Sequence, residues 1–215
     1  MTQLRTPASP RLPDPGPAGV NAGYMVGFIN VLRLYLNQAS NLFQLVFGPR
    51  GGQYVDMPNG VFFDIIDQTL AAIDTATPVR FRQTYLSNGV RVNAGTDSRI
   101  YCDVGGIYNF QFSGQLVSNS ASAKQAYIWI VRNGTDIGYS THQYTLEGSS
   151  NHLNINWNFS IDMSAGDYLE MEWSADSTNI TLEATAAASP HPGIPSAVMS
   201  VTYVAPLPSV LPTPP

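Results

Sequence analysis

Apolar and polar side chains alternate residue by residue along positions 152–163. Successive side chains of a β-strand point to opposite faces of a sheet, so this alternation predicts a long strand with one buried and one solvated face. Leu169, Met171 and Trp173 repeat the alternation after a turn that contains Gly166. We therefore expect the two strands to pair as a hairpin.

Further runs have the character of strands and are separated by clusters of turn-forming residues. They read RIYCDV, GIYNFQFSGQLV, QAYIWIVR, NITLEA and AVMSVTYV. Many short strands without intervening helices predict a mainly β fold, either a β-sandwich or a jelly roll, over residues 79–204. In QAYIWIVR, Ile128 and Ile130 alternate with other large apolar residues, so both faces of this strand are apolar. Such a strand is expected to be covered on two sides, the second side either by loops of the opposite sheet or by another subunit.

Over residues 23–47 the apolar residues recur with the period of an α-helix. Apolar positions recur there at alternating spacings of three and four residues, at Ile29, Leu32, Leu36, Ala39, Phe43 and Val46. Phe28, Tyr35 and Leu42 widen this stripe, which predicts an amphipathic helix that is apolar over most of its circumference. Leaving the stripe in water would forfeit on the order of 10 kcal/mol. We expect the helix to pack on other copies of itself or on a partner.

A membrane span is the main alternative for this helix. Polar residues interrupt the apolar run, among them Asn30, Arg33 and Asn37. No uninterrupted apolar stretch of spanning length remains, so burial against protein is the better interpretation and no membrane insertion is expected.

The flanking segments are rich in proline and turn formers. Prolines remove backbone donors, so residues 1–22 are expected to be an extended arm. Residues 48–78 are expected to form an irregular connector, in which VFFDIIDQTLAAIDTATP is ambiguous and is interpreted as a strand followed by a turn of helix. Residues 205–215 form a Pro-rich tail, expected to lie extended along a neighbouring subunit.

Composition narrows the class of protein. Only 12% of residues are charged and the net charge is −5, so the polar surface must come largely from Asn, Ser, Thr, Gln and Gly. Neutralising phosphates requires more Lys and Arg, which argues against a nucleic-acid partner. Cys102 is the single cysteine, so no intrachain disulfide forms, and we expect it to be buried on a strand. The first residues lack the apolar run of a secretory signal.

Candidates for catalysis or metal binding are few. Ser149, Ser150 and His152 are the nearest nucleophiles and base, but they lie in or beside a predicted hairpin turn, so no enzyme activity is expected. His142 and His152 flank the same turn and are expected to face each other across it. Two imidazoles without a nearby carboxylate make a poor metal site, so neither metal nor cofactor is predicted.

Four segments follow one another in an order typical of one superfamily. They are VGGIYNFQFSGQL, AYIWIVRNGTDI, FSIDMSAGDYLEMEWS and AVMSVTYV. Together they resemble the tumour necrosis factor-like superfamily, which includes the globular heads of the complement recognition collagens. Members are homotrimers, so the resemblance implies a jelly roll and a homotrimer. The implied trimer interface comprises Tyr108, Phe110, Tyr127, Trp129 and Val131.

A Pro-rich arm and the helix containing INVLRLYLNQASNLFQLVFGPRGGQY precede these strands. This combination resembles structural proteins of tailed bacteriophages, especially those of marine bacteria and cyanobacteria. The resemblance implies a non-enzymatic virion protein, either a capsid decoration or a short fibre, attached to other virion proteins. The implied attachment residues are Pro7, Pro10, Arg11, Pro13, Phe28, Ile29, Leu32, Tyr35, Leu36 and Phe43.

The alternative interpretation is a tail receptor-binding protein that recognises a host surface glycan or protein. Loops of a rigid sandwich can vary without disturbing its core, so they are the expected contact sites. The candidate residues in these loops are Ser118, Asn119, Ser149, Asn151 and His191.

Overall fold

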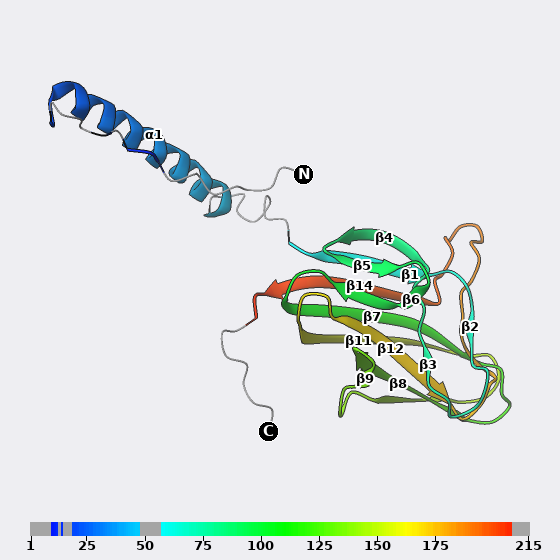
Figure 1. The fold of residues 1–215 in the computed structure, drawn as a ribbon. Coiled ribbons are helices and arrows are strands. Elements are labelled where there is room, and N and C mark those ends of the chain that lie inside the picture. Colours follow the sequence, from blue (N-terminus) through cyan, green and yellow to red (C-terminus); the bar gives the residue numbers. More distant parts are fainter. Residues whose placement is uncertain (1–9, 13, 15–18, 48–56, 208–215) are drawn as a thin grey trace. The chain divides into compact units, whose positions relative to one another are not determined.

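The computed structural model describes residues 10–12, 14, 19–47 and 57–207 (Figure 1). They belong to two compact units, Met1–Asp56 and Met57–Pro215, which we describe separately. Most of the predicted arm and tail lie outside the described residues, and so do the predicted attachment residues Pro7 and Pro13.

The first unit contains helix α1, Ala22–Phe47. Asn21 precedes it: the backbone N–H of Tyr24 donates to Asn21 Oδ1 at 2.9 Å, and that of Met25 donates to the Asn21 carbonyl at 3.0 Å. The side-chain bond satisfies one of the amide donors that a helix start leaves unpaired, so the helix begins one residue before the predicted start. Within the described part of the chain, no helix is long and apolar enough to cross a bilayer.

The second unit is a β-sandwich of two antiparallel sheets, which confirms the predicted mainly β class. The first sheet contains β1 (Asn59–Asp64), β2 (Gln68–Thr69), β4 (Gln83–Asn88), β7 (Gly106–Ser118), β11 (Asn151–Met163), β13 (Ile180–Leu182) and β14 (Ala197–Ala205). The second contains β3 (Thr77–Pro78), β5 (Val90–Asn93), β6 (Thr96–Cys102), β8 (Lys124–Arg132), β9 (Thr135–Asp136), β10 (His142–Leu146) and β12 (Tyr168–Ala175).

The order of strands places β10 and β11 at the ends of their sheets. In the first sheet the order is β4-β1-β14-β7, and β11 pairs with β7 along its whole length. Strand β13 pairs with the last residues of β7, beyond the end of β14. In the second sheet the order is β10-β8-β12-β6-β5, with β3 and β9 as short additions.

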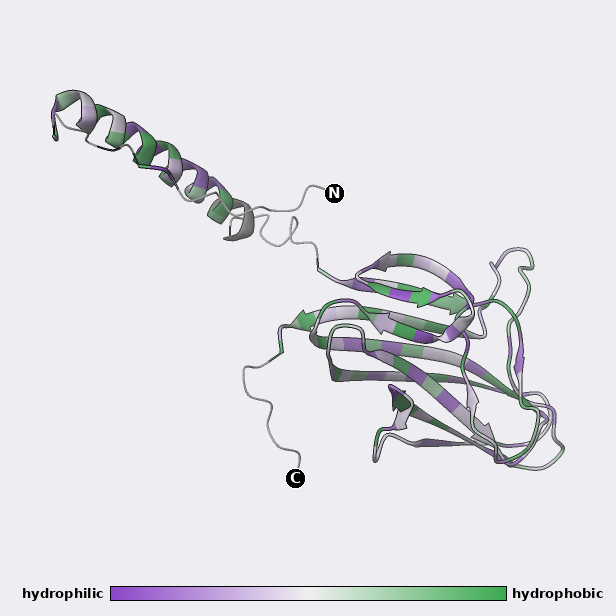
Figure 2. Cartoon of the chain, in the orientation of Figure 1, coloured by the Kyte–Doolittle hydropathy of each residue, from purple (hydrophilic) through white to green (hydrophobic). Residues whose placement is uncertain are grey.

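The core lies between the sheets and follows from the alternation along the strands, which is visible in Figure 2. Strand β7 turns Tyr108, Phe110 and Phe112 inward, and Trp173 on β12 is fully buried against the same core. Burying a large apolar side chain contributes roughly 1.5–3 kcal/mol, so each of these buried side chains stabilises the sandwich. Cys102 is buried among them on β6, as predicted.

The predicted hairpin between residues 152–163 and 169–173 is wrong. Strand β11 pairs with β7 in the first sheet, whereas β12 pairs with β3, β6 and β8 in the second. The turn between them therefore crosses from one sheet to the other. It is closed by Asp167, whose Oδ2 accepts from the Ser164 N–H at 2.8 Å. Alternation predicts a strand but carries no information about its partner.

The predicted domain boundary at residue 79 is also wrong. Strand β1 lies between β14 and β4 in the first sheet, so the sandwich begins at Met57 and includes most of the predicted connector. The ambiguous segment after residue 60 supplies β1, β2 and β3, and residues 57–78 contain a turn but no helix. At the other end β14 continues to Ala205.

Candidate interaction surfaces

An aromatic edge lies between the two end strands β10 and β11. It consists of His142, Tyr144, Trp157 and Phe159, whose side chains are only partly covered. The His142 and Trp157 rings are 4.2 Å apart between centroids, and the Trp157 and Phe159 rings are 5.0 Å apart. Phe159 stacks on the core residue Phe110 at 5.4 Å, which anchors the edge to the interior.

This edge arises because the sandwich ends at β10 and β11. Each of these strands has a neighbour on one side only, so side chains that point toward the core lack full cover at the open margin. Aromatic pairs of this kind contribute about 0.5–1.5 kcal/mol beyond their buried area. These contacts stabilise the cluster within one chain, yet it retains apolar surface that a partner can bury.

Uncharged amide and hydroxyl side chains cover the middle of the outer side of β7, β11 and β14, between His152 near one end of β11 and Asp162 near the other; we call them the amide face. It consists of Asn109, Gln111, Ser113, Gln115, Asn154, Asn156, Asn158, Ser160, Ser200 and Thr202. Asn109 Nδ2 donates to Asn158 Oδ1 at 2.6 Å, and Gln111 Nε2 donates to Asn109 Oδ1 at 3.3 Å. Ser113 Oγ donates a hydrogen bond to Asn154 Oδ1 at 3.3 Å. Hydrogen bonds across the strands thus satisfy part of this face without any ion.

The outer side of the second sheet is charged instead. The Arg99 guanidinium lies 4.5 Å from the centroid of the Tyr168 ring and pairs with Glu170 at 3.2 Å. Arg91 lies 4.8 Å from the centroid of the Tyr101 ring. The two sheets therefore present chemically different surfaces, one of amides and hydroxyls and one of ion pairs and tyrosines.

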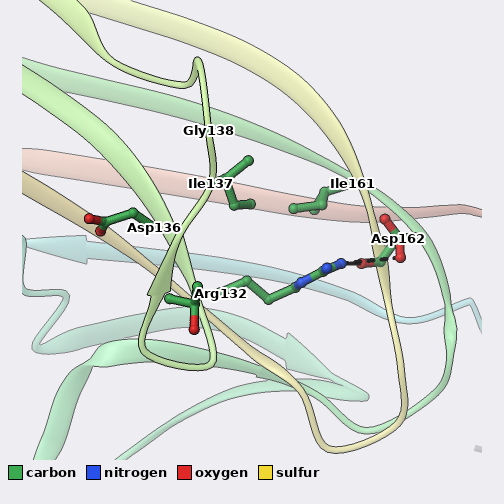
Figure 3. Close-up of a pocket in the computed structure, with 7 residues that line it drawn as sticks. Arg132, Asp136, Ile137, Gly138, Ile161 and Asp162 are labelled. Carbon is green, nitrogen blue, oxygen red and sulfur yellow. Dashed lines mark hydrogen bonds and ion pairs between the residues drawn. The ribbon is translucent and has the colours of Figure 1, made fainter. Parts of the chain in front are cut away.

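A pocket of about 330 Å³ lies between the β8–β9 turn region and β11 (Figure 3). It is lined by Arg132, Thr135, Asp136, Ile137, Gly138, Ile161 and Asp162. Arg132 Nη1 donates to the Asp162 carbonyl at 2.9 Å and to its Oδ2 at 3.1 Å, which ties β8 to β11. Asp136 Oδ1 accepts from Trp129 Nε1 at 3.0 Å. The charged groups of the pocket thus already have partners: Arg132 and Asp162 join the two sheets, and Asp136 bonds within the second sheet.

Three of the residues expected at a trimer interface are buried in their own chain. Tyr108 and Phe110 are fully buried in the core, and Val131 is also buried. Tyr127 and Trp129 lie on the outer side of β8, half-buried and bonded to Gln125 and Asp136 of the same chain. The second apolar face of β8 is therefore covered in part by its own chain. The aromatic side chains of β7 point toward the core. Alternation shows that they share one face of the strand but not which surface that face contacts.

The predicted host-contact residues differ in their exposure to solvent. Ser118 is fully buried at the end of β7, so its assignment to an exposed loop is wrong. Ser118 lies on the same face of β7 as Phe112 and Leu116, which are also buried. Asn119, Ser149 and His191 are exposed, and Asn151 is half-buried at the start of β11.

The histidines do not form the predicted pair. His142 on β10 pairs in register with Ile128 of β8, and His152 on β11 pairs with Val117 of β7, so they belong to different sheets. His152 Nδ1 lies 3.5 Å from Glu183 Oε2, and Ser149 and Ser150 lie in the turn before it. Among the described residues no group of three or more His, Cys, Asp or Glu residues is placed to hold a metal ion.

Helix α1 carries most of the expected attachment residues. Ile29, Leu36 and Phe43 are exposed, while Phe28, Leu32 and Tyr35 are half-buried. In the arm, Pro10 is half-buried and Arg11 is exposed. Met25 is exposed as well; it was not predicted as an attachment residue, although it lies four residues before Ile29 and continues the same spacing. We call Met25, Ile29, Leu36 and Phe43 the exposed row of α1.

No protein-family model and no curated protein matches this chain. The function is therefore inferred from three surfaces of the described residues: the aromatic edge, the amide face and the exposed row of α1.

Proposed function

We propose that this chain is a non-enzymatic structural protein of a tailed-phage particle, which assembles as a homotrimer through a tumour necrosis factor-like jelly roll. The strand order supports the jelly roll. Eight strands, β1, β6, β7, β8, β10, β11, β12 and β14, form a β1-β14-β7-β11 sheet and a β6-β12-β8-β10 sheet. Taken in chain order with the other strands set aside, these eight alternate between the two sheets except at β8 and β10, which share the second sheet. Two antiparallel sheets connected by crossovers of this kind are characteristic of double Greek keys.

The observation that carries the homotrimer is that β11 bears two different interaction surfaces. Its inward side contributes Trp157 and Phe159 to the aromatic edge, and its outward side contributes Asn156 and Asn158 to the amide face. When two different patches pair head to tail, the assembly closes into a ring if the rotation allows it. We infer that the aromatic edge of one subunit packs beside the amide face of the next.

The absence of charge on the amide face favours such burial. Taking a charged side chain out of water costs several kcal/mol unless it is paired, whereas an amide that keeps a hydrogen bond is much cheaper to bury. The cores of protein interfaces are accordingly depleted of Asp, Glu and Lys. The charged outer side of the second sheet is the side we expect to face solvent.

Attachment to the particle is assigned to the first unit. Helix α1 exposes large apolar side chains, and the Pro-rich arm before it has low chain entropy, which lowers the cost of ordering it on a partner. The second unit has its own core, so we assign attachment to the particle to the N-terminal segment.

The homotrimer is tested by sedimentation of the full chain. We expect three times the mass of one chain. In a chain without residues 1–47, which lacks helix α1, we expect Asn156→Arg to sediment as a monomer because it introduces an unpaired charge into the interface. Gln83→Arg is the matched control, an exposed position on β4, which lies at the opposite end of the first sheet from β11. A monomeric native chain, or a trimer that tolerates Asn156→Arg as well as Gln83→Arg, contradicts the proposal.

The particle assignment needs a separate experiment. Purified particles from the organism that encodes the chain should contain it when examined by mass spectrometry. A deletion of residues 1–47 should still trimerise but should be missing from the particles. Normal incorporation of this deletion would refute attachment through the N-terminal segment.

One feature favours host recognition as a second role. Tyr139 is fully exposed on the loop after β9 and has a positive φ of 60°, a conformation uncommon for a residue with a side chain. Exposed aromatics are common anchors in binding sites. If the loop binds a host glycan or protein, Tyr139→Ala should reduce adsorption of the trimer to host cells without changing its sedimentation. Unchanged adsorption would exclude Tyr139 from the contact.

A further inference from the structure

We infer that α1 forms a parallel, in-register coiled coil with α1 helices of other copies of this chain. The inference begins with a heptad repeat that runs through the whole helix. Its a and d positions are Ala22, Met25, Ile29, Leu32, Leu36, Ala39, Phe43 and Val46. The spacing of three and four residues continues without a break, and a sustained 3.5-residue apolar repeat keeps one seam facing a partner helix.

Much of the seam is exposed in a single chain, whereas Leu32 and Ala39 are half-buried. Met25, Ile29 and Leu36 are 41%, 45% and 59% exposed, respectively. A helix in a globular protein normally turns such a row toward a core, because each large side chain contributes roughly 1.5–3 kcal/mol when buried. The row on α1 therefore has the spacing of a face that packs against a core, yet its large side chains remain exposed in one chain.

The repeat identifies the partner as another α1. An irregular apolar patch suits many surfaces, but an unbroken heptad is matched by a second helix with the same repeat, whose side chains fit between its own. Arg33 is the single charged residue of α1, at a position beside the seam. Opposite charges that would select a different helix, or an antiparallel one, are thus missing from α1 itself.

The width of the seam indicates more than two helices. Phe28, Tyr35 and Leu42 occupy the g positions and extend the apolar stripe to one side, while Asn30 and Asn37 occupy the outward b positions. A two-stranded coil buries mainly a and d, whereas a helix that touches two neighbours also buries a flanking position. That the number is three rests on the proposed homotrimer; self-association rests on the heptad alone.

This assignment changes what attaches to the particle. Ile29 and Leu36 then contact neighbouring copies, and attachment falls to the arms and to the outward side of the coil. A coil joins its chains in the same direction, so the three arms begin together at one end. Three adjacent arms offer multivalent binding, which strengthens attachment without any new contact within one chain.

Disulfide trapping in the full chain tests the inference. Ile29→Cys places a thiol at an a position, where parallel helices bring the same residue of two copies together, and Asn30→Cys places one on the outward side as the matched control. In an antiparallel pair aligned end to end the two Ile29 positions would lie about 16 Å apart, too far to link. Cys102 stays in both variants because it is fully buried.

On mild oxidation we expect Ile29→Cys to form a covalent dimer several-fold faster than Asn30→Cys. Equal rates, or no link in either variant, overturn the coiled coil, and docking on an unrelated partner or a lipid surface would give that result. Sedimentation of the same samples separates the two proposals. A trimer without selective linking refutes only the coil, whereas selective linking in a dimer supports the coil and refutes the homotrimer.

Discussion

A buried ion pair at the end of β1 makes a demanding test of the fold. Asp64 is fully buried, and Arg82 Nη1 lies 2.7 Å from its Oδ2. Asp64 Oδ1 also accepts from the Ile66 N–H at 3.1 Å, and Gln68 Nε2 lies 3.5 Å from Oδ2. Arg82→Met keeps the apolar stem but removes the cation, which leaves the carboxylate buried with hydrogen bonds alone.

The expected cost follows from this geometry. Removing one partner of a buried ion pair typically costs 3–5 kcal/mol. The Arg82 side chain is 29% exposed, so water screens part of the interaction, and we expect a loss of about 3 kcal/mol. With a urea dependence of about 2 kcal/mol/M, the unfolding midpoint should fall by about 1.5 M at a fixed protein concentration.

Two further variants isolate the cause. Arg80→Met breaks a pair with Asp97 at 3.5 Å in which the Arg80 side chain is 50% exposed, so we expect a loss of under about 1 kcal/mol. Asp64→Asn combined with Arg82→Met removes both charges and should recover much of the loss. The reasoning is refuted if Arg82→Met costs no more than Arg80→Met, or if the double variant is as unstable as Arg82→Met.

Three further predictions concern single side chains. Burial raises the pKa of the Cys102 thiol to about 12, so a thiol reagent at pH 8 should label the urea-unfolded chain and leave the native chain unlabelled; rapid native labelling would contradict this. Burial, with smaller effects of Asp136 and Glu170, raises the pKa of Glu172, so the folded state holds this proton more tightly than the unfolded chain and loses that stability as pH rises through the folded pKa. Glu172→Gln should therefore raise the melting temperature at pH 7 relative to the native chain, with a smaller difference at pH 4; an equal gain at both pH values would speak against this cause. Trp173 Nε1 is buried without a hydrogen-bond partner, so Trp173→Phe removes an unsatisfied donor and should cost less than about 3 kcal/mol in urea unfolding, below the usual cost of a large core truncation.

The strands and the helix were predictable because their signals are local. Alternation identified β11 and β12, and the three-and-four spacing identified α1 to within one residue. The burial of Cys102 followed from its place within an apolar run. The segment that supplies β1 was ambiguous because six residues carry too little periodicity to separate a strand from a short helix.

The interaction surfaces were predicted less well. The residues expected at a trimer interface included Tyr108 and Phe110, because an apolar strand indicates burial without saying against what. The aromatic edge joins His142 to Trp157, which belong to different sheets, and the amide face joins residues of β7 and β11 whose order in the sheet is set by long-range pairing. A polar row at alternate positions 154–160 was visible in the sequence, but its meaning depends on the strands beside it.

The sequence by itself determined the periods: where the chain alternates by two, where it turns helical, and that the helical stretch carries an unbroken heptad. Those features depend on neighbours a few residues apart, whose side chains share a face whatever the fold. The tertiary structure alone decided that β11 and β12 part into different sheets, that the sandwich starts at Met57, and that β11 exposes aromatics on one side and amides on the other. Pairing of that kind depends on contacts between residues far apart along the chain, and local alternation carries no record of them.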